Sequence, residues 1–361
     1  MSDPASGALR LGPATQRLRF LSNLAFSAEP FQLEAFDALD RGGSVLVSAP
    51  TGSGKTLIAE YSIAGTIERG TKAFYTTPLK ALSNQKYQDL CKLFGDERVG
   101  LLTGDVSIRP AAPIVVMTTE VLRNMLLAGS NLTAELETVV LDEVHYLQDP
   151  YRGGVWEEVL VLCSPKVRFV CLSATVANAN ELGSWLRSIR PPVEVVVEEH
   201  RPITLRHHFA IRDRGVDRAR LSPLLSKARA SDEALRVDQA VRRAGPSRAQ
   251  RWGRGARGRD GSGLPIVTPR RLEVIELLDD EDLLPAIVFI FSRAACDDAV
   301  RQCVRDGVRL TGRSERAAIR AVAERHVEPL TDDDLSVLGY PEWLEGLESG
   351  LAAHHAGLVP A

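Results

Sequence analysis

The fold of this chain is decided by a glycine-rich stretch, Ala49-Pro50-Thr51-Gly52-Ser53-Gly54-Lys55-Thr56. The stretch lies between an apolar run at 44–48 and a helix-patterned run at 57–64. A strand, a glycine-rich turn and a helix in this order are what a phosphate-binding loop requires. The two glycines allow successive N–H groups to point into one concavity, and the following helix adds its positive end. We therefore interpret Ala49 to Thr56 as a nucleotide-binding loop.

The last two residues of this loop have the chemistry that a bound nucleoside triphosphate needs. Lys55 is suited to reach the β- and γ-phosphates as a point charge, and the Thr56 hydroxyl is suited to ligate Mg²⁺. Ala49 stands where the general pattern has its first glycine, and alanine is acceptable there if the residue keeps a negative φ. The alternative is a glycine-rich turn without function, which the flanking strand and helix argue against.

A pair of acids, Asp142-Glu143, ends the apolar run 138–141 and is followed by Val144-His145. Both carboxylates are therefore expected at the carboxyl edge of a strand, where open α/β sheets bind ligands. Asp142 suits the Mg²⁺ shell, and Glu143 suits the orientation and deprotonation of an attacking water. Two adjacent acids alone are typical of a solvated turn, but the upstream loop favours catalysis. We predict a catalytic set of Glu143, Asp142, Lys55 and His145.

Composition limits the class of protein. The chain is 44% hydrophobic, has no run of eighteen apolar residues, and begins without the basic and apolar segments of a secretion signal. The five cysteines form no Cys-x-x-Cys pair, which favours free thiols over a zinc site. We expect a soluble, cytoplasmic protein with no membrane partner.

The net charge of −3 conceals a local basic region. Residues 211–260 contain 14 Lys and Arg against 6 Asp and Glu, and 242–259 is rich in Gly and Arg. A segment of this composition cannot bury enough apolar surface to fold alone. Two interpretations stay open: a solvated connection, or a flexible arm that binds nucleic-acid phosphates.

Short apolar runs alternate with helical patterns in the first two hundred residues, at 44–48, 72–76, 113–117, 138–141 and 168–172. This alternation predicts an α/β domain with a parallel sheet covered on both faces. A second unit begins with a predicted strand at 285–291 and a helix at 294–300, and 351–355 is another strand candidate. Two strands do not complete an α/β domain, so we expect the chain to end within its second domain.

With the motifs placed, the chain resembles the superfamily 2 DExH-box helicases of the Ski2-like group, the relatives of Ski2 and Mtr4, and in particular their HelY-type members. In this family the glycine-rich loop corresponds to motif I and Asp142 to His145 to motif II. Ser173-Ala174-Thr175 resembles motif III, in which Ser173 and Thr175 would couple nucleotide state to strand movement. Gln32 stands where the family has a glutamine that reads adenine, which implies ATP rather than GTP.

The resemblance also implies a domain plan. We expect an N-terminal tail at 1–25, a RecA-like P-loop NTPase domain with a parallel sheet at 26–200, an exit segment with the basic insertion at 201–270, and an incomplete second RecA-like domain at 271–361. In the family, motif V and the arginine-bearing motif VI lie beyond the point where this chain ends. Those arginines stabilise the transition state, so we expect this chain alone to bind ATP with little turnover.

Two further segments, 76–86 and 118–125, resemble the nucleic-acid contacts of the family. Each follows a predicted strand and opens a helix, where free N–H groups bind backbone phosphates of any base sequence. The alternative is a pair of threonine N-caps with surface basic residues. The predicted contacts, including one from the motif IV resemblance at 290–293, are Thr77, Pro78, Lys80, Thr118, Thr119, Arg123 and Arg293.

Two more stretches resemble family signatures. Tyr151 to Glu158 carries an Arg-Gly…Trp-Glu pattern, in which we interpret Trp156 as a core residue. The stretch 354–360 resembles a His-His-x-Gly-Leu-Leu-Pro element. Adjacent histidines on a strand point to opposite faces, so we do not interpret His354 and His355 as a metal site.

The sequence therefore predicts an ATP-dependent RNA helicase that uses ATP and Mg²⁺ to move along single-stranded RNA, with protein partners unknown. One alternative is a truncated ATP- and nucleic-acid-binding module without turnover, and another is a DNA helicase. An unrelated small-molecule kinase or GTPase is disfavoured by the two threonine-containing segments and by the lack of an Asn-Lys-x-Asp guanine reader.

Overall fold

The computed structural model describes residues 12–355 except 177, 214, 217, 228 and 245–265. The chain divides into two compact units, Met1–Thr204 and Leu205–Ala361. Most of the basic Gly- and Arg-rich stretch and the end of the His-His element lie outside the described residues. Within the described part of the chain, no helix has the length and apolar character needed to cross a membrane.

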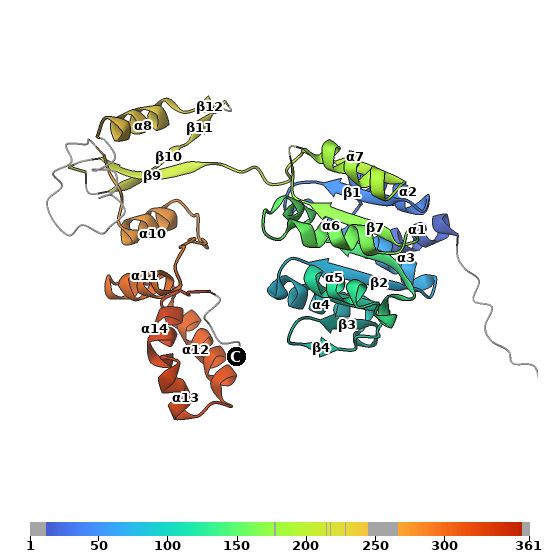
Figure 1. Ribbon diagram of the computed structural model, residues 1–361. Coiled ribbons are helices and arrows are strands. Elements are labelled where there is room, and N and C mark those ends of the chain that lie inside the picture. Colours follow the sequence, from blue (N-terminus) through green and yellow to red (C-terminus); the bar gives the residue numbers. More distant parts are fainter. Residues whose placement is uncertain are drawn as a thin grey trace, which may run out of the picture. The chain divides into compact units, whose positions relative to one another are not determined.

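An eight-stranded sheet forms the centre of the first unit (Figure 1). Its spatial order is β4-β3-β5-β2-β6-β7-β1-β8, and every neighbouring pair is parallel except β3 with β4. The predicted α/β fold with a parallel sheet is confirmed. The strands are β1 (Ser44–Ser48), β2 (Lys72–Thr77), β3 (Val99–Leu102), β4 (Ser107–Ile108), β5 (Ile114–Thr118), β6 (Leu136–Leu141), β7 (Arg168–Ser173) and β8 (Val193–Val197).

Helices cover both faces of this sheet, as parallel strands require. Figure 1 shows α5, α6 and α7 in front of the strands, with α3 and α4 behind them. The helices are α1 (Pro13–Ser22), α2 (Pro30–Asp40), α3 (Thr56–Glu68), α4 (Lys80–Phe94), α5 (Thr119–Leu127), α6 (Gly153–Leu162) and α7 (Ala179–Ile189), with the 3-10 turns η1 (Asp96–Arg98), η2 (Asn131–Thr133) and η3 (Val144–Gln148).

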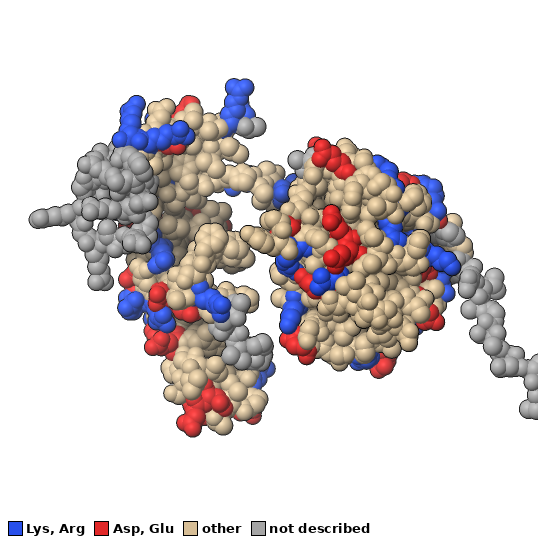
Figure 2. Space-filling view, viewed as in Figure 1, with Lys and Arg blue, Asp and Glu red and all other residues tan. Residues whose placement is uncertain are grey.

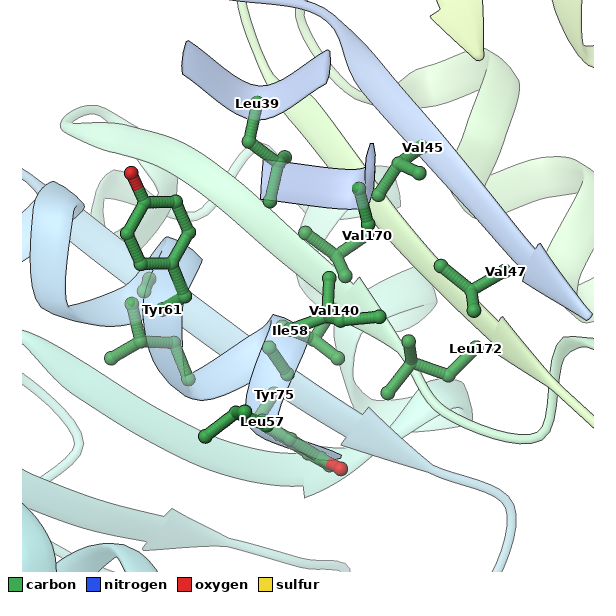
Figure 3. Packing of buried hydrophobic residues seen from close by; sticks show 14 of the residues in the cluster. Leu39, Val45, Val47, Leu57, Ile58, Tyr61, Tyr75, Val140, Val170 and Leu172 are labelled. Atoms are coloured by element: carbon green, nitrogen blue, oxygen red, sulfur yellow. The ribbon is translucent and has the colours of Figure 1, made fainter. Parts of the chain in front are cut away.

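Alternation along the strands divides the core into two layers. Val45 and Val47 of β1 belong to the cluster on the α2 and α3 side, whereas Leu46 between them belongs to the cluster on the α5 and α6 side. Figure 3 shows the first layer, in which Val140 lies close to Ile58 of α3. Burying apolar surface is worth about 25 cal/mol per Å². The two packed faces therefore hold the strand ends, and the loops that follow them, in fixed positions.

Helix α1 lies within the segment 1–25 that the sequence assigns to a tail. Its Phe20 packs edge-to-face against Tyr61 of α3 and Phe36 of α2, at centroid distances of 5.2 and 6.0 Å. Its Arg17 forms an ion pair of 2.7 Å with Asp37. These contacts join α1 to the outer surface of the α2 and α3 layer.

The second unit combines a small antiparallel sheet with helices. Strand β9 lies between β10 and β13, and β11 pairs with β12. Its elements are β9 (His208–Asp213), β10 (Ala219–Pro223), β11 (Leu225–Ser226), β12 (Arg229–Ala230), α8 (Asp232–Ala244), β13 (Ile266–Val267), α10 (Arg271–Asp280), α11 (Arg293–Arg305), α12 (Arg313–Val327), α13 (Asp332–Val337) and α14 (Tyr340–Glu348).

Two strand predictions in the second unit are wrong. The apolar run 285–291 is extended but is not a strand, and neither is 351–355. Ile287, Phe289 and Phe291 are 83%, 83% and 106% exposed. A strand is defined by hydrogen bonds to a neighbour, and these residues pair with no other part of the described chain. The predicted helix at 294–300 does form, as part of α11.

Candidate functional site at the carboxyl edge of the sheet

The glycine-rich loop joins the end of β1 to the start of α3, as the sequence predicts. Gly52 and Gly54 have φ of +82° and +83°, a left-handed conformation that glycine adopts without strain. Ala49 is fully buried, and its N–H donates to the carbonyl of Ser173 across the sheet. The loop therefore has the backbone conformation that turns N–H groups into one concavity.

Lys55 folds back over this loop. Its ammonium donates to the carbonyl oxygens of Ala49 and Pro50, at 2.7 and 2.9 Å. Burial lowers the pKa of Lys55, while the carboxylates of Glu143 and Asp142 act in the opposite direction. A half-buried ammonium inside a loop of this shape is positioned to meet phosphate oxygens.

Two buried hydroxyls near the loop have no hydrogen-bond partner among the described residues. The hydroxyl of Ser53 is buried and makes no hydrogen bond to any described residue, and the same holds for Ser173 at the end of β7. Buried polar groups are almost always hydrogen-bonded, so such atoms require an explanation. A phosphate group supplies acceptor oxygens of the kind that these two hydroxyls lack. The residues present therefore fit a bound nucleotide.

The two predicted Mg²⁺ ligands are each held by a neighbour. The Asp142 carboxylate accepts a hydrogen bond of 2.8 Å from the buried hydroxyl of Tyr75 on β2. The Thr56 hydroxyl accepts one of 3.2 Å from the ammonium of Lys86 on α4. The Lys86 ammonium also lies 5.9 Å from the centre of the Tyr75 ring. A hydroxyl and a carboxylate suit the oxygen preference of Mg²⁺, and these contacts fix their orientation.

Glu143 has an unusual backbone. Its φ is +55°, a left-handed conformation that is uncommon for residues other than glycine and tends to occur at functional sites. Its N–H donates to the Asp142 carboxylate at 3.0 Å, and its own carboxylate lies 3.3 Å from Nδ1 of His145. The Glu143 carboxylate therefore contacts His145, whereas the Asp142 carboxylate contacts Tyr75 and the Glu143 N–H. The two acids can therefore serve different functions.

The motif III segment is joined to the loop strand. The Ser48 hydroxyl at the end of β1 accepts from the N–H of Val176 at 3.2 Å and donates to the carbonyl of Ala174 at 3.4 Å. Ser173 is fully buried, whereas Thr175 is exposed. A displacement of the phosphate loop and the end of β1 would therefore also displace the segment 173–176, to which Ser48 is hydrogen-bonded. The coupling function of Ser173 and Thr175 stays a prediction.

Gln32 lies against the loop and is 2% exposed. Its side-chain nitrogen donates to the carbonyl of Gly54 at 3.0 Å, and its side-chain oxygen accepts from the N–H of Glu29 at 2.8 Å. A methyl group at Gly54 would lie 2.7 Å from that nitrogen and would displace the Gln32 amide, and the φ of +83° at Gly54 independently favours glycine. The predicted adenine reader is therefore fixed against the phosphate loop.

The two predicted nucleic-acid segments lie side by side. Strand β2 pairs in parallel with β5, and Thr77 is the register partner of Thr118. Both strands end at the same sheet edge, and each leads into a helix, α4 or α5. The structure thus brings the two helix-opening turns together. Strand β2 also neighbours β6, whose end carries Asp142.

Internal hydrogen bonds engage the threonine hydroxyls of these turns. Thr77 is fully buried and contacts the carbonyl of Leu79 and the hydroxyl of Ser83, at 2.9 and 2.8 Å. Thr119 is also fully buried and donates to the carbonyl of Thr77 at 3.4 Å. These side chains hold the turns in shape, so a strand would meet the backbone and the basic side chains instead.

The basic residues of these turns are more accessible. Lys80 is exposed and forms an ion pair of 2.9 Å with Asp105, and Arg123 lies 3.4 Å from Glu158. Surface pairs of this kind are worth about 1 kcal/mol or less, so both can exchange partners for phosphate. Figure 2 shows acidic and basic side chains close together on the visible face of the first unit. Arg293 begins α11 in the second unit and is exposed.

Sequence reasoning missed the residues that link the motifs to one another. Tyr75 lies inside a predicted strand, and Lys86 ends a segment that was interpreted as a nucleic-acid contact. Nothing local to either residue indicates that it reaches Asp142 or Thr56. Arg152 was noted only as part of a pattern, although it contacts both nucleic-acid turns.

Comparison with known proteins identifies the domain. Residues 29–182 match the model of the DEAD/DEAH box helicase family. The chain is 50% identical over 347 residues to a probable helicase HelY of Mycobacterium tuberculosis (strain CDC 1551 / Oshkosh), covering 95% of this chain and 38% of that protein. It therefore spans well under half the length of this relative.

Other relatives include eukaryotic proteins. The chain is 37% identical to the human Superkiller complex protein 2 over 93% of its own length and 27% of that protein. It is 35% identical to the ATP-dependent RNA helicase mtr4 of Schizosaccharomyces pombe (strain 972 / ATCC 24843), over 93% of its own length and 30% of that protein. The Mycobacterium smegmatis helicase Lhr bound to single-stranded DNA and AMP-PNP aligns with a TM-score of 0.43 and 30% identity, covering 52% of this chain and 28% of that one.

Proposed function

We propose that this chain, whose residues 29–182 match the DEAD/DEAH box helicase family and whose relatives include mtr4 and the Superkiller complex protein 2, couples ATP hydrolysis to movement along single-stranded RNA. One observation carries this proposal. The phosphate loop, the Asp142-Glu143 pair and the two helix-opening turns follow the ends of β1, β6, β2 and β5, which all finish at one sheet edge with only β7 between them. A nucleotide and a single strand can therefore be bound by adjacent parts of the same surface.

The proposed division of labour follows from the geometry. Lys55, Ser53 and the loop N–H groups bind the triphosphate, and Thr56 and Asp142 would hold Mg²⁺, which neutralises phosphate charge when bound. Glu143 orients the attacking water and accepts its proton. Gln32 is proposed to read adenine from its position against the loop. A reducing cytoplasm is the proposed location, which suits the five free thiols.

RNA is favoured over DNA because two relatives are RNA-associated by name, mtr4 and the DExH15 RNA helicase of Arabidopsis thaliana. Contacts to the sugar-phosphate backbone carry no base information, so we expect no sequence preference. A DNA helicase is the second candidate, because contacts of this kind bind phosphate, which RNA and DNA share. Binding of matched RNA and DNA strands of equal length would distinguish the two.

The proposal is tested by hydrolysis under single-turnover conditions, with protein in excess over ATP so that slow rates register. We expect a 20-mer of single-stranded RNA to raise the rate constant, and Glu143→Gln to remove the stimulated part. The proposal would be contradicted if the chain binds ATP but RNA changes neither its affinity for ATP nor its hydrolysis rate constant.

A further inference from the structure

Arg152 stands at the junction of all three functional turns, outside the residues assigned to ATP or to the strand. It is the residue just before α6, and its guanidinium donates to the carbonyl of Pro78 at 2.7 Å. The same guanidinium forms an ion pair with Glu120 in the first turn of α5. Its Nε donates to Oε1 of Glu120 at 3.2 Å, and a second guanidinium nitrogen donates to the same oxygen. One side chain thus joins the turn after β2 to the turn after β5.

The third connection runs to the segment that follows Asp142-Glu143. The Arg152 guanidinium lies 5.6 Å from the ring centres of both Tyr146 in η3 and Trp156 in α6. Those two rings stack on each other with centroids 5.7 Å apart. A cation over aromatic faces is held in place by attraction to the ring electrons. The guanidinium therefore has a fixed platform built from the motif II side of the site.

The backbone around Arg152 is shaped to present it. The Asp149 carboxylate accepts from the N–H groups of Tyr151 and Arg152, at 2.8 and 2.9 Å, and these bonds lower the pKa of Asp149. A methyl group on Gly153 would lie 2.2 Å from the carbonyl oxygen of Leu147, so the turn requires glycine there. This arrangement fixes the direction in which Arg152 leaves the backbone.

We propose that Arg152 is a positioning residue that sets the spacing of the two nucleic-acid turns relative to each other and to the motif II segment. This inference rests on the proposed function. Its planar fork satisfies Glu120 and Pro78 together, which the point charge of lysine cannot do with the same geometry. Since the guanidinium is engaged inside the chain, it acts on the strand through Pro78 and Glu120 rather than by contacting phosphate.

The test measures affinity for a single-stranded RNA 20-mer by fluorescence anisotropy at several salt concentrations. We expect Arg152→Gln and Arg152→Lys to weaken binding about 5- to 20-fold without changing the slope of log affinity against log salt. A residue that contacts phosphate directly would lower that slope by about 1. Arg123→Gln is the positive control for this slope change.

Two controls separate positioning from loss of fold. Arg41→Lys alters another arginine of the first unit, one that donates three hydrogen bonds to the carboxylate of Glu194, and it should leave RNA affinity unchanged. ATP-analogue affinity should stay within twofold in all Arg152 variants. The double variant Glu120→Gln/Arg152→Gln should bind RNA as weakly as whichever single variant binds less tightly. Both changes remove the same ion pair, between Arg152 and Glu120, so their effects should not add.

The outcomes are distinct. A smaller slope in Arg152→Gln would assign the residue to direct phosphate contact and overturn the inference. RNA affinity equal to that of the wild-type chain in Arg152→Gln, or recovered in Arg152→Lys, would also overturn it. A wild-type chain that binds no RNA would refute the proposed function itself, and the inference with it.

Discussion

The two halves of the functional edge satisfy their polar groups in opposite ways. At the nucleotide half, formed by the ends of β1, β7 and β6, the buried hydroxyls of Ser53 and Ser173 have no hydrogen-bond partner among the described residues, and Glu143 has a left-handed backbone. At the strand half, formed by the ends of β2 and β5, the hydroxyls of Thr77 and Thr119 are buried and internally bonded.

This difference indicates two kinds of binding. Unpartnered groups and local strain are costs that a ligand can relieve, which supports our proposal that the nucleotide half is organised around bound phosphates. Internally satisfied turns are rigid without a ligand, so the strand half presents a preformed backbone surface. The contacts from Lys86 to Thr56 and from Tyr75 to Asp142 join the halves.

The largest expected effect tests the function of the strained residue. Glu143→Gln keeps the size of the side chain and removes the base, so we expect the single-turnover rate constant to fall by about 10²- to 10⁴-fold. ATP-analogue affinity should stay within about twofold. Turnover equal to that of the wild-type chain would show that Glu143 is not the base.

The second prediction separates the halves by affinity. Lys55→Ala removes a charged donor from the triphosphate, at a cost of about 1.5–3 kcal/mol, which corresponds to roughly 10- to 150-fold in ATP affinity. RNA affinity in the absence of nucleotide should not change, because Lys55 lies in the other half. Titration with a fluorescent ATP analogue and with labelled RNA gives both values. A parallel loss of RNA binding would mean that the halves are not separate.

The third prediction compares one hydroxyl from each half. Thr77→Val removes the two hydrogen bonds of a buried hydroxyl, to the carbonyl of Leu79 and to the hydroxyl of Ser83, and should lower the free energy of unfolding by about 1–3 kcal/mol. Ser53→Ala removes a hydroxyl that has no internal partner, so stability should hold or rise while ATP affinity falls. Urea unfolding of both variants, with Thr77→Ser as the control, measures the difference. Equal destabilisation by the two changes would abolish the contrast.

The smallest effect concerns Glu60 of α3, which lies near Lys86. Burial raises the pKa of Glu60, so the folded chain binds this proton more tightly than the unfolded chain. The carboxyl group therefore destabilises the fold once the pH exceeds its unfolded value of about 4.3, and this cost is absent below that pH. We expect Glu60→Gln to raise the melting temperature by about 1–2 °C at pH 7.5 and by less at pH 4.5.

A result of the opposite sign would also be informative. A lower melting temperature in Glu60→Gln at pH 7.5 would mean that attraction to Lys86 outweighs burial. The link between the halves would then include Glu60 as a third member.

The nucleotide half could be predicted from the sequence because its chemistry is encoded by contiguous residues. Eight residues specify the loop, and two acids after an apolar run specify the second motif. The alternation of apolar runs with helical patterns was likewise sufficient for the parallel sheet. Each of these features lies within a short stretch of contiguous residues, so it can be recognised in a single sequence.

The connections between motifs could not be predicted because they join distant residues. Arg152 to Pro78, Lys86 to Thr56 and Tyr75 to Asp142 each depend on strand order, which no local pattern encodes. The run 285–291 shows that a local pattern can also predict an element that does not form. Its composition predicts a strand, but pairing requires a neighbour, and the described chain does not place one beside it.

We propose that ATP and a single strand occupy separate halves of one sheet edge. The most direct test is the affinity of the wild-type chain for a labelled single-stranded RNA 20-mer, measured with and without a saturating non-hydrolysable ATP analogue and Mg²⁺. Adjacent, separate sites predict a ternary complex in which the ATP analogue leaves RNA affinity unchanged or increases it. RNA should then increase the affinity for the ATP analogue by the same factor. Displacement of RNA by the analogue would show that the two ligands share one site, and would contradict the account.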